Sequence, residues 1–384
     1  MLFDSKLPDV GTTIFTIMSR RAVEEGALNI GQGFPDYPID PRLAGLVAEA
    51  IRGGHNQYAP MEGSQALREE IASKLERCYG CKIDPVQEIT VTCGATEALF
   101  DAIQTVIGSG DEAIIFDPAY DAYEPAVRLA GGRCVRVPLD PPSFRFDWDR
   151  VRASISPLTR LIIINSPQNP ACTTASAADL AQLAAAIRDR PITVLSDEVY
   201  EHVVFDAVRH ASVLASPELR ERSFAVFSFG KTLHATGWRT GYCVAPPRLT
   251  QELRKVHQFN TFSIAAPLQQ AIAEYLRDNA QSWMGLSEFF QAKRDLLSGL
   301  LHGSRLRALK SQGTYFQLID YSAIDDRGDL EFCDRLIREA KVATIPLSPF
   351  YAEPPRMHLV RLCLAKRDDT IREAAQRLLQ FAAS

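Results

Sequence analysis

A lysine that directly follows an apolar run is the first residue whose setting suggests chemistry. Lys231 lies in SFGKTLHATGWRTG (228–241), after the apolar segment FAVFSF (224–229) and near a second cation, Arg239. Partial burial and a neighbouring cation lower the pKa of an amine and make it a nucleophile able to form a Schiff base. Taken by itself, the segment fits a hydrated surface lysine better than a nucleophile.

The same segment also has the ending of a phosphate-binding P-loop, glycine followed by lysine and threonine. A P-loop requires another glycine five residues before the glycine of that ending, and Ala225 stands at this position. We therefore exclude a P-loop.

Two other apolar runs end in polar groups that could hold an aromatic cofactor. Asp197 ends ITVLSD (192–197), and Tyr200 follows three residues later. A carboxylate in this place can keep a pyridine nitrogen protonated, which turns the ring into an electron sink. Asn169 lies in NSPQNP (165–170) and offers a side-chain amide.

A further run ends in a candidate phosphate site. In VTCGATEAL (91–99), Gly94 follows the apolar run, and Ala95 and Thr96 open a predicted helix. Backbone N–H groups and a hydroxyl at the start of a helix bind phosphate. Each of these segments is a weak signal alone, because a glycine after a strand is most often an ordinary turn.

The elements that must position these residues alternate in type. Short runs rich in β-branched residues, separated by longer amphipathic stretches, predict an α/β fold with a mostly parallel sheet covered by helices. The predicted strands are 88–92, 113–118, 160–165, 192–197, 224–229 and 241–246. In such sheets ligands bind at the carboxyl ends of the strands, where the candidate residues lie.

The pattern changes after residue 246, which predicts a second, smaller α+β domain. Helices are expected at 248–259, from about 265, at 283–301, at 329–340 and from about 368, and strands at 314–320 and 358–365. We expect an N-terminal arm with part of the small domain in residues 1–44, a large cofactor-binding domain in 45–280, and the rest of the small domain in 281–384.

Composition excludes several classes of protein. The 384 residues, 46% of them apolar, suffice for a large core. The 42 Lys and Arg residues, against 47 Asp and Glu, form no basic block, so nucleic acid is not an expected partner. No apolar run approaches the ~18 residues of a membrane span. Eight cysteines in mostly apolar segments suggest reduced thiols and a cytoplasmic protein, and the lone pair Cys78 and Cys81 lacks the second pair of a zinc site, so no metal is expected.

Together these segments resemble a known family. GATEAL, DPAYDAYEP, NSPQNP, SDEVYEH, SFGKTLHATGWRTG and RLCLAK occur in the order seen in the class I aminotransferases, which are pyridoxal-phosphate enzymes of fold type I. The resemblance covers nearly the whole chain. Through GQGFPD, NQYAP, VHQFNTFS and GTYFQLIDYS the sequence is most similar to the bacterial methionine aminotransferases and the kynurenine/glutamine aminotransferases.

The resemblance implies pyridoxal 5′-phosphate as cofactor and a role for each matching residue. Lys231 would bind the cofactor covalently and then move a proton, and Asp197 would face the pyridine nitrogen. Asn169 and Tyr200 would bind the phenolic oxygen. The other implied contacts are Tyr120 stacked on the ring, Gly94, Ala95, Thr96, Ser228 and Arg239 around the phosphate, and Tyr58 reaching in from the other subunit of a homodimer. Some relatives have an aromatic residue where Thr96 stands beside Ala95.

For the substrate, the resemblance implies that Arg361, in HLVRLCLAK, grips the α-carboxylate, with Gly33 and Asn169 in support. A planar guanidinium holds a carboxylate through two hydrogen bonds and so orients the Cα–H bond. The implied side-chain pocket consists of Phe15, Phe34, Tyr123 and, from the partner subunit, Phe262. No second arginine is placed for a side-chain carboxylate, which argues against aspartate as the preferred donor.

The expected function is therefore transfer of an amino group from a thioether-bearing or aromatic L-amino acid, methionine above all, to a 2-oxo acid. One alternative on the same fold is a β-lyase that cleaves cysteine conjugates or cystathionine. An alternative of another class is a ligand-sensing regulator, which needs a DNA-binding module before the fold; only about 30 residues precede GQGFPD, and they show no helix-turn-helix pattern.

Overall fold

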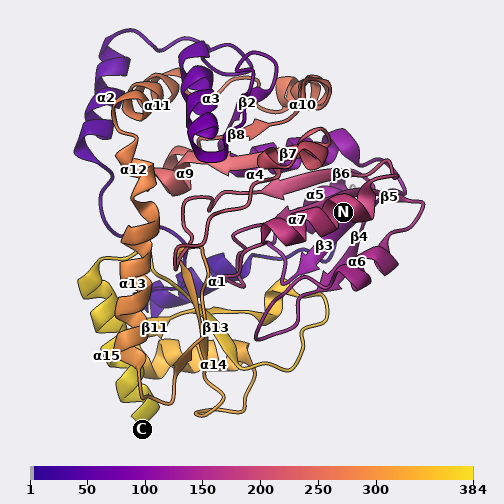
Figure 1. Cartoon of the computed structure of the whole chain (residues 1–384). Coiled ribbons are helices and arrows are strands. Elements are labelled where there is room, and N and C mark those ends of the chain that lie inside the picture. Colours follow the sequence, from indigo (N-terminus) through magenta and orange to yellow (C-terminus); the bar gives the residue numbers. More distant parts are fainter. Residues whose placement is uncertain (1–3, 384) are drawn as a thin grey trace.

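A seven-stranded sheet forms the centre of the larger part of the molecule (Figure 1). The computed structural model describes residues 4–383. The strands are β2 (Ile89–Thr92), β3 (Glu112–Asp117), β4 (Arg133–Pro138), β5 (Thr159–Asn165), β6 (Thr193–Asp197), β7 (Ser223–Ser228) and β8 (Gly241–Val244). Their order is β2-β8-β7-β6-β5-β3-β4, and β8 runs antiparallel to both β2 and β7, while the other neighbours are parallel. The six predicted strands and the α/β class are confirmed.

The sequence analysis missed β4. This strand pairs with β3 alone and forms one edge of the sheet, and it carries Arg133 and Arg136, both paired with acidic groups. Charged side chains are common on edge strands because they discourage pairing with other chains, and here they interrupt the apolar run that would have predicted a strand.

Helices cover both faces of this sheet. Along β5, Ile162 and Ile164 point into one apolar core, and Leu161 and Ile163 point into another, as the two-residue period of a strand requires. The first core includes residues of α3 (Gln65–Tyr79), α6 (Trp148–Ser154) and α7 (Ala177–Ile187), and the second includes residues of α4 (Gly94–Val106), α5 (Tyr123–Leu129) and α10 (Pro247–Asn260). The short helices α8 (Pro217–Arg220) and α9 (Phe229–Thr232) flank β7.

A smaller unit with its own core lies below this sheet in Figure 1. Its antiparallel sheet has the order β12-β13-β10-β9, and a separate parallel pair joins β1 to β11. The strands are β1 (Leu28–Asn29), β9 (Arg307–Ala308), β10 (Phe316–Asp320), β11 (Val342–Ala343), β12 (Ile345–Pro346) and β13 (Leu359–Cys363). The buried core residues come from positions 18–30 and 297–382, which brings the N-terminal arm beside the C-terminal part.

The helices predicted after residue 246 are present with small shifts, and two helices near the N-terminus, α1 (Ile14–Glu24) and α2 (Pro41–Arg52), were not predicted. The later helices are α11 (Ala266–Asp278), α12 (Gln281–Met284), α13 (Leu286–Leu301), α14 (Asp329–Arg335) and α15 (Asp368–Ala383). The helix expected at 329–340 consists of α14 followed by a π-helical stretch, Leu336–Ala340. The helix expected at 283–301 is divided, because Trp283 belongs to α12.

The long helix α13 connects the two units. Its first half contributes Leu286 and Phe290 to the core of the large unit, and its second half contributes Leu297 and Leu301 to the core of the small unit. Figure 1 shows it running from one layer to the other. We therefore propose a boundary within α13 rather than at residue 281.

At the N-terminal side we propose a boundary before Pro41 instead of after residue 44. Helix α2 begins at Pro41 and packs against α11 of the large unit. The Asp40 carboxylate caps α2 and also accepts a hydrogen bond of 2.7 Å from the hydroxyl of Tyr275 in α11. The arm thus ends where this helix starts.

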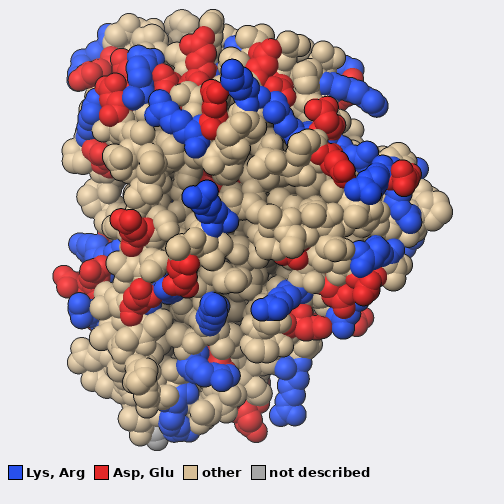
Figure 2. Space-filling model, in the orientation of Figure 1, with Lys and Arg blue, Asp and Glu red and all other residues tan. Residues whose placement is uncertain are grey.

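Charges of both signs are interspersed over the molecular face in Figure 2. No helix in the described part of the chain is long and apolar enough to cross a membrane. All eight cysteines are free thiols.

Two buried glutamates fix the segment that follows β6. The Glu201 carboxylate receives hydrogen bonds of 2.5 Å from the Lys74 amine and 2.5 Å from the Tyr79 hydroxyl, both from α3. The Glu198 carboxylate lies 2.8 Å from Nε2 of His210. Against the effect of burial, which raises it, His202 and Lys74 hold the pKa of the Glu201 carboxyl well below its usual range. Because Asp197 and Tyr200 belong to this segment, the glutamates also fix two candidate site residues.

Removing the cation of this buried pair tests how much the segment depends on it. We expect Lys74→Met to lower the free energy of unfolding by about 3–5 kcal/mol near pH 7, because it leaves the Glu201 carboxylate buried without its partner. In the variant the pKa of Glu201 rises above its value in the unfolded chain, so the variant regains stability as the pH falls through that raised pKa. Urea unfolding of the wild type and variant at several pH values measures both effects.

The double variant Lys74→Met/Glu201→Gln is the matched control, and it should recover most of the lost stability at pH 7. Equal losses in the single and double variants would contradict this account of the pair.

Candidate active site

A cavity opens between the carboxyl ends of the large sheet's strands and the small unit. Most of the predicted site residues line it: Phe15, Gly33, Ala95, Thr96, Tyr120, Asn169, Asp197, Tyr200, Ser228, Lys231, Arg239 and Arg361. Residues as far apart in the sequence as Phe15 and Arg361 thus line one cavity. It lies where the topology of an open α/β sheet positions ligands. Five residues that the sequence analysis did not select also line the cavity: Gln32, Leu99, Asn165, Val199 and Phe316.

The start of α4 forms an anion-binding cradle at one end of this cavity. The helix begins at Gly94, and no side chain caps its first N–H groups, which leaves them free to bind an anion. Gly94 has a φ of +71°, and a Cβ atom there would lie 2.8 Å from Nη2 of Arg239. The same Nη2 donates a hydrogen bond of 3.2 Å to the Thr96 hydroxyl. Glycine is therefore required for the guanidinium to lie against the turn.

Asp197 lies at the end of β6, on the floor of the cavity. Burial raises the pKa of its carboxyl to about 6, although hydrogen bonds from the Tyr123 hydroxyl (2.6 Å) and the Val199 amide (3.3 Å) oppose the shift. The arrangement favours a cationic partner for Asp197, since a nearby positive charge would restore the ionised form.

Tyr123 is not where the resemblance placed it. It is 3% exposed and does not line the cavity, because its hydroxyl points to Asp197 from behind. We therefore withdraw Tyr123 from the substrate pocket; its contact supports the carboxylate instead.

Lys231 lies in the short helix α9, which follows β7. Burial, helped by the nearby cations Arg239 and Arg361, lowers the pKa of its amine to about 8, although Asp197 opposes the shift. At neutral pH an appreciable share of the amine is thus unprotonated and nucleophilic. Its Nζ donates a hydrogen bond of 2.8 Å to the hydroxyl of Tyr315.

The sequence analysis did not select Tyr315 as a site residue. It stands in TYFQLID (314–320), which the pattern identified only as a strand, and it directly precedes β10. The sequence around a tyrosine next to a strand does not indicate which group its hydroxyl will bond.

The small unit supplies Arg361, which is fully buried in β13. One Nη donates to Oδ1 of Asn169 and the other to the Gly31 carbonyl (3.2 Å), whereas Nε has no hydrogen-bond partner in the part of the chain that the structure describes. Among residues 4–383 no carboxylate pairs with it. The guanidinium lies 3.8 Å from the centre of the Phe316 ring. A buried cation with spare hydrogen-bonding capacity is a site for a carboxylate.

The predicted aromatic residues of the pocket have different positions. Phe15 lines the cavity and packs against Phe350, with ring centres 5.6 Å apart. Phe34 lies outside the cavity, 38% exposed, with the Lys366 amine 4.3 Å from its ring centre. Its predicted place in the substrate pocket stays a prediction.

Tyr58 and Phe262 both lie on the surface. Their side chains are 85% and 43% exposed, and their ring centres are 5.6 Å apart. Neither lines the cavity of its own chain.

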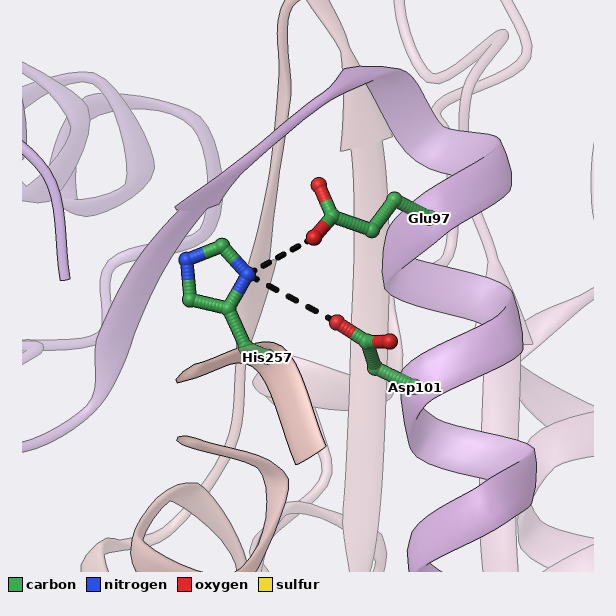
Figure 3. Close-up of side chains that lie close together, drawn as sticks. All are labelled: Glu97, Asp101 and His257. Carbon is green, nitrogen blue, oxygen red and sulfur yellow. Dashed lines mark hydrogen bonds and ion pairs between the residues drawn. The ribbon is translucent and has the colours of Figure 1, made fainter. Parts of the chain in front are cut away.

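Behind the cradle lies a cluster whose residue types could bind a metal (Figure 3). Glu97 and Asp101 lie one turn apart on α4 and face His257 of α10. Nδ1 of His257 lies 2.8 Å from Glu97 Oε1 and 3.6 Å from Asp101 Oδ2, and Nε2 lies 2.8 Å from the Met61 carbonyl. Both ring nitrogens face oxygen acceptors, which suits an imidazolium that donates from both of them.

The cluster is instead a buried ion pair that holds the cradle. Although burial opposes the charge, Asp101 and Glu97 raise the pKa of His257 to about 9. The second oxygen of Glu97 accepts a hydrogen bond from the Cys93 amide, just before the cradle. The imidazolium thus ties the start of α4 to the segment around Met61.

The residues of the cavity fit pyridoxal 5′-phosphate. The cradle with Thr96, Arg239 and Ser228 suits its phosphate, and the buried Asp197 suits its pyridine nitrogen. The amine of Lys231 lies on the same cavity as both.

Comparisons with known proteins agree with this fit. Residues 25–378 match the family model described as "Aminotransferase class I and II". Over 377 residues, 98% of each chain, the sequence is 52% identical to the methionine aminotransferase of Escherichia coli, and it is 30% identical to human kynurenine–oxoglutarate transaminase 1, covering 94% of this chain and 93% of that one.

The fold is shared as well. A crystal structure of Escherichia coli YbdL, described as having a methionine aminotransferase function, superimposes with a TM-score of 0.97 at 51% identity and covers 99% of this chain and all of that one. An aspartate aminotransferase of Thermus thermophilus gives 0.90 at 29% identity over 99% of each chain. The chain therefore belongs to the class I and II aminotransferase family and is a pyridoxal-phosphate-dependent enzyme that moves amino groups between amino acids and 2-oxo acids.

Proposed function

We propose that this aminotransferase takes its amino group preferentially from methionine and next from aromatic L-amino acids such as phenylalanine, tyrosine or kynurenine. The acceptor is a 2-oxo acid with an apolar or amide-bearing side chain. The observation that supports this proposal best is the setting of Arg361: its Nε has no partner among the described residues, and aromatic rings surround its guanidinium, with the ring centres of Phe15 and Phe316 5.1 and 3.8 Å away.

The residues divide the work by position. Arg361 binds the α-carboxylate and Asn169 orients the guanidinium, so the Cα–H bond is held in a fixed direction. Lys231 holds the cofactor covalently and, once released, moves the proton at Cα. Asp197 keeps the pyridine nitrogen protonated. The bound cofactor supplies an electron sink for the pair left when that proton departs.

The cavity has no cation to spare for a charged side chain. Its cations are Lys231, Arg239 and Arg361, and the first and last are assigned to the cofactor and the α-carboxylate. Arg239 belongs to the phosphate cradle through Thr96. A second carboxylate would therefore lose its hydration without gaining a partner, whereas a thioether gains contacts of about 0.3–1.5 kcal/mol with each aromatic ring it meets. The names of the Escherichia coli and human relatives support the same order of substrates.

We also propose a homodimer in which Tyr58 and Phe262 enter the partner's active site, with Tyr58 completing the phosphate site. Two aromatic side chains exposed together, with Phe259 also 85% exposed nearby in sequence, leave apolar surface for a second copy to cover. The eight free cysteines support a location in the cytoplasm, where thiols stay reduced.

Substrate preference is tested by steady-state kinetics. With one common 2-oxo acid acceptor, we expect kcat/KM to rank methionine first, phenylalanine and glutamine next, and aspartate at least ~100-fold lower, because desolvating its side chain costs several kcal/mol. Aspartate as the best donor would contradict the proposal, since it would require a second cation in the pocket. Product formation without any acceptor would indicate a β-lyase instead.

Asp197→Ala tests the role of the carboxylate. The variant should still bind the cofactor to Lys231 but lose several orders of magnitude in kcat, because the protonated ring nitrogen is lost. Tyr123→Phe is the graded control: it removes one hydrogen bond to Asp197 and should cost far less. Absorbance spectra report cofactor binding, and near-normal turnover of Asp197→Ala would refute the assignment.

Tyr58→Phe tests whether Tyr58 enters the partner's active site. Because it removes one phosphate contact, we expect the cofactor to dissociate several-fold faster, while borohydride still fixes the cofactor to Lys231. Sedimentation should show a dimer for the wild type and for the variant. A fully active wild-type monomer would overturn the proposed assembly.

A further inference from the structure

The hydroxyl of Tyr315 is bonded at once to the reactive amine and to the segment that borders the substrate site. It accepts a hydrogen bond of 2.8 Å from Nζ of Lys231 and donates one of 2.7 Å to the Gly33 carbonyl. Lys231 follows strand β7 of the large sheet, Tyr315 directly precedes strand β10 of the small sheet, and Gly33 belongs to the N-terminal arm. Three parts of the chain therefore meet at one oxygen atom.

The position of this hydroxyl is closely fixed. Tyr315 is 1% exposed, and its ring lies edge-on to those of Tyr200 and Phe316, with centres 5.0 and 4.9 Å away. Its own carbonyl accepts from the Leu364 amide at 2.7 Å. A side chain at Gly33 would come within 2.8 Å of Phe316, so glycine allows the arm to approach. The tyrosine cannot move without disturbing these contacts.

The direction of the two hydrogen bonds determines what the amine can do. The Gly33 carbonyl can only accept, so the proton of Tyr315 is committed to it and the phenol oxygen offers lone pairs to Lys231. An amine that donates one N–H to Tyr315 keeps its lone pair in another tetrahedral direction, free to take a proton. Burial, with Tyr200 beside it, raises the pKa of Tyr315 well above its usual value, so the phenol stays neutral.

The Gly33 segment also contacts the substrate-binding arginine. The Gly31 carbonyl, two residues away, accepts from Arg361 at 3.2 Å. One short stretch of backbone thus spans the group that would hold the substrate carboxylate and the group that holds the amine.

From this geometry we propose that Tyr315 is a positioning residue for Lys231: its hydroxyl holds the amine whenever the amine is not bonded to the cofactor, and it ties the amine to the Gly31–Gly33 segment beside Arg361. The proposal rests on the role of Lys231 given under the proposed function but is independent of which amino acid the enzyme prefers.

The test compares Tyr315→Phe with the wild type in the cofactor-free full-length chain. Competitive acetylation by acetic anhydride over a range of pH, with peptide mass mapping, gives the pKa of Lys231. Other groups facing Lys231 are Asp197 from β6, Arg239 from the loop before β8, and Arg361 and Cys363 from β13, and all remain in the variant. The change in pKa therefore reports the lost hydroxyl.

We expect the pKa of Lys231 to fall by about one unit in Tyr315→Phe, because the ammonium form loses its hydrogen-bond acceptor. In the enzyme with its cofactor bound, kcat should fall ~10–100-fold, because the hydroxyl no longer holds the Lys231 amine in position to move the proton at Cα. KM for the amino donor should change little, since Arg361 is unchanged.

Tyr321→Phe is the matched control. Tyr321 is also a buried tyrosine of the small unit, and its hydroxyl donates to a backbone carbonyl, that of Arg327, at 2.9 Å. This control should leave the pKa of Lys231 and kcat unchanged. An unchanged pKa in Tyr315→Phe, or the same shift in Tyr321→Phe, would overturn the proposal. A changed substrate ranking in the wild type would instead contradict only the proposed specificity.

Discussion

Charged groups buried around one cavity are the constraint on which this structure depends. Arg361 is wholly buried and forms no ion pair within residues 4–383, and burial moves the pKa values of Lys231 and Asp197 toward their neutral forms. Each of these groups lowers the stability of the empty fold. A bound cofactor and substrate would bring charges opposite to those of the buried groups. The buried charges thus serve ligand binding at the expense of the free energy of folding.

A hydrogen-bonded chain of amides connects these charges. Arg361 donates to Asn169, whose backbone amide donates to the side chain of Asn165 at 2.8 Å, and Asn165 in turn donates to the Asp197 carbonyl at 3.0 Å. Asn165 ends β5 and Asp197 ends β6, where the two strands are in register. The parallel pairing of neighbouring strands therefore sets the spacing between the substrate-binding arginine and the cofactor-binding carboxylate.

Much of this arrangement was predictable because it depends on local patterns. The strands contain β-branched residues in short runs, and Lys231, Asp197, Asn169 and the Gly94 turn directly follow such runs. Parallel topology then requires them to meet at one edge of the sheet. Arg361 came from the resemblance alone, since an arginine within a strand pattern would otherwise be an edge cation.

What could not be predicted depends on contacts between distant parts of the chain. Tyr315 meets Lys231 across 84 positions, and His257 meets Glu97 across 160. The resemblance assigned Tyr123 to the substrate pocket, yet its hydroxyl donates to Asp197 across 74 positions. No periodicity or motif encodes such pairings, which arise only when the sheet and the small unit are packed together.

The position of the reactive amine is the central claim, and peptide mapping of the borohydride-reduced enzyme tests it most directly. Reduction makes the link between cofactor and lysine permanent, and mass spectrometry then identifies the modified residue. The account predicts the pyridoxyl group on Lys231 and on no other lysine. Finding it instead on Lys366, whose amine is buried but bonded to the Phe34 carbonyl, or on the exposed Lys255 would contradict the account.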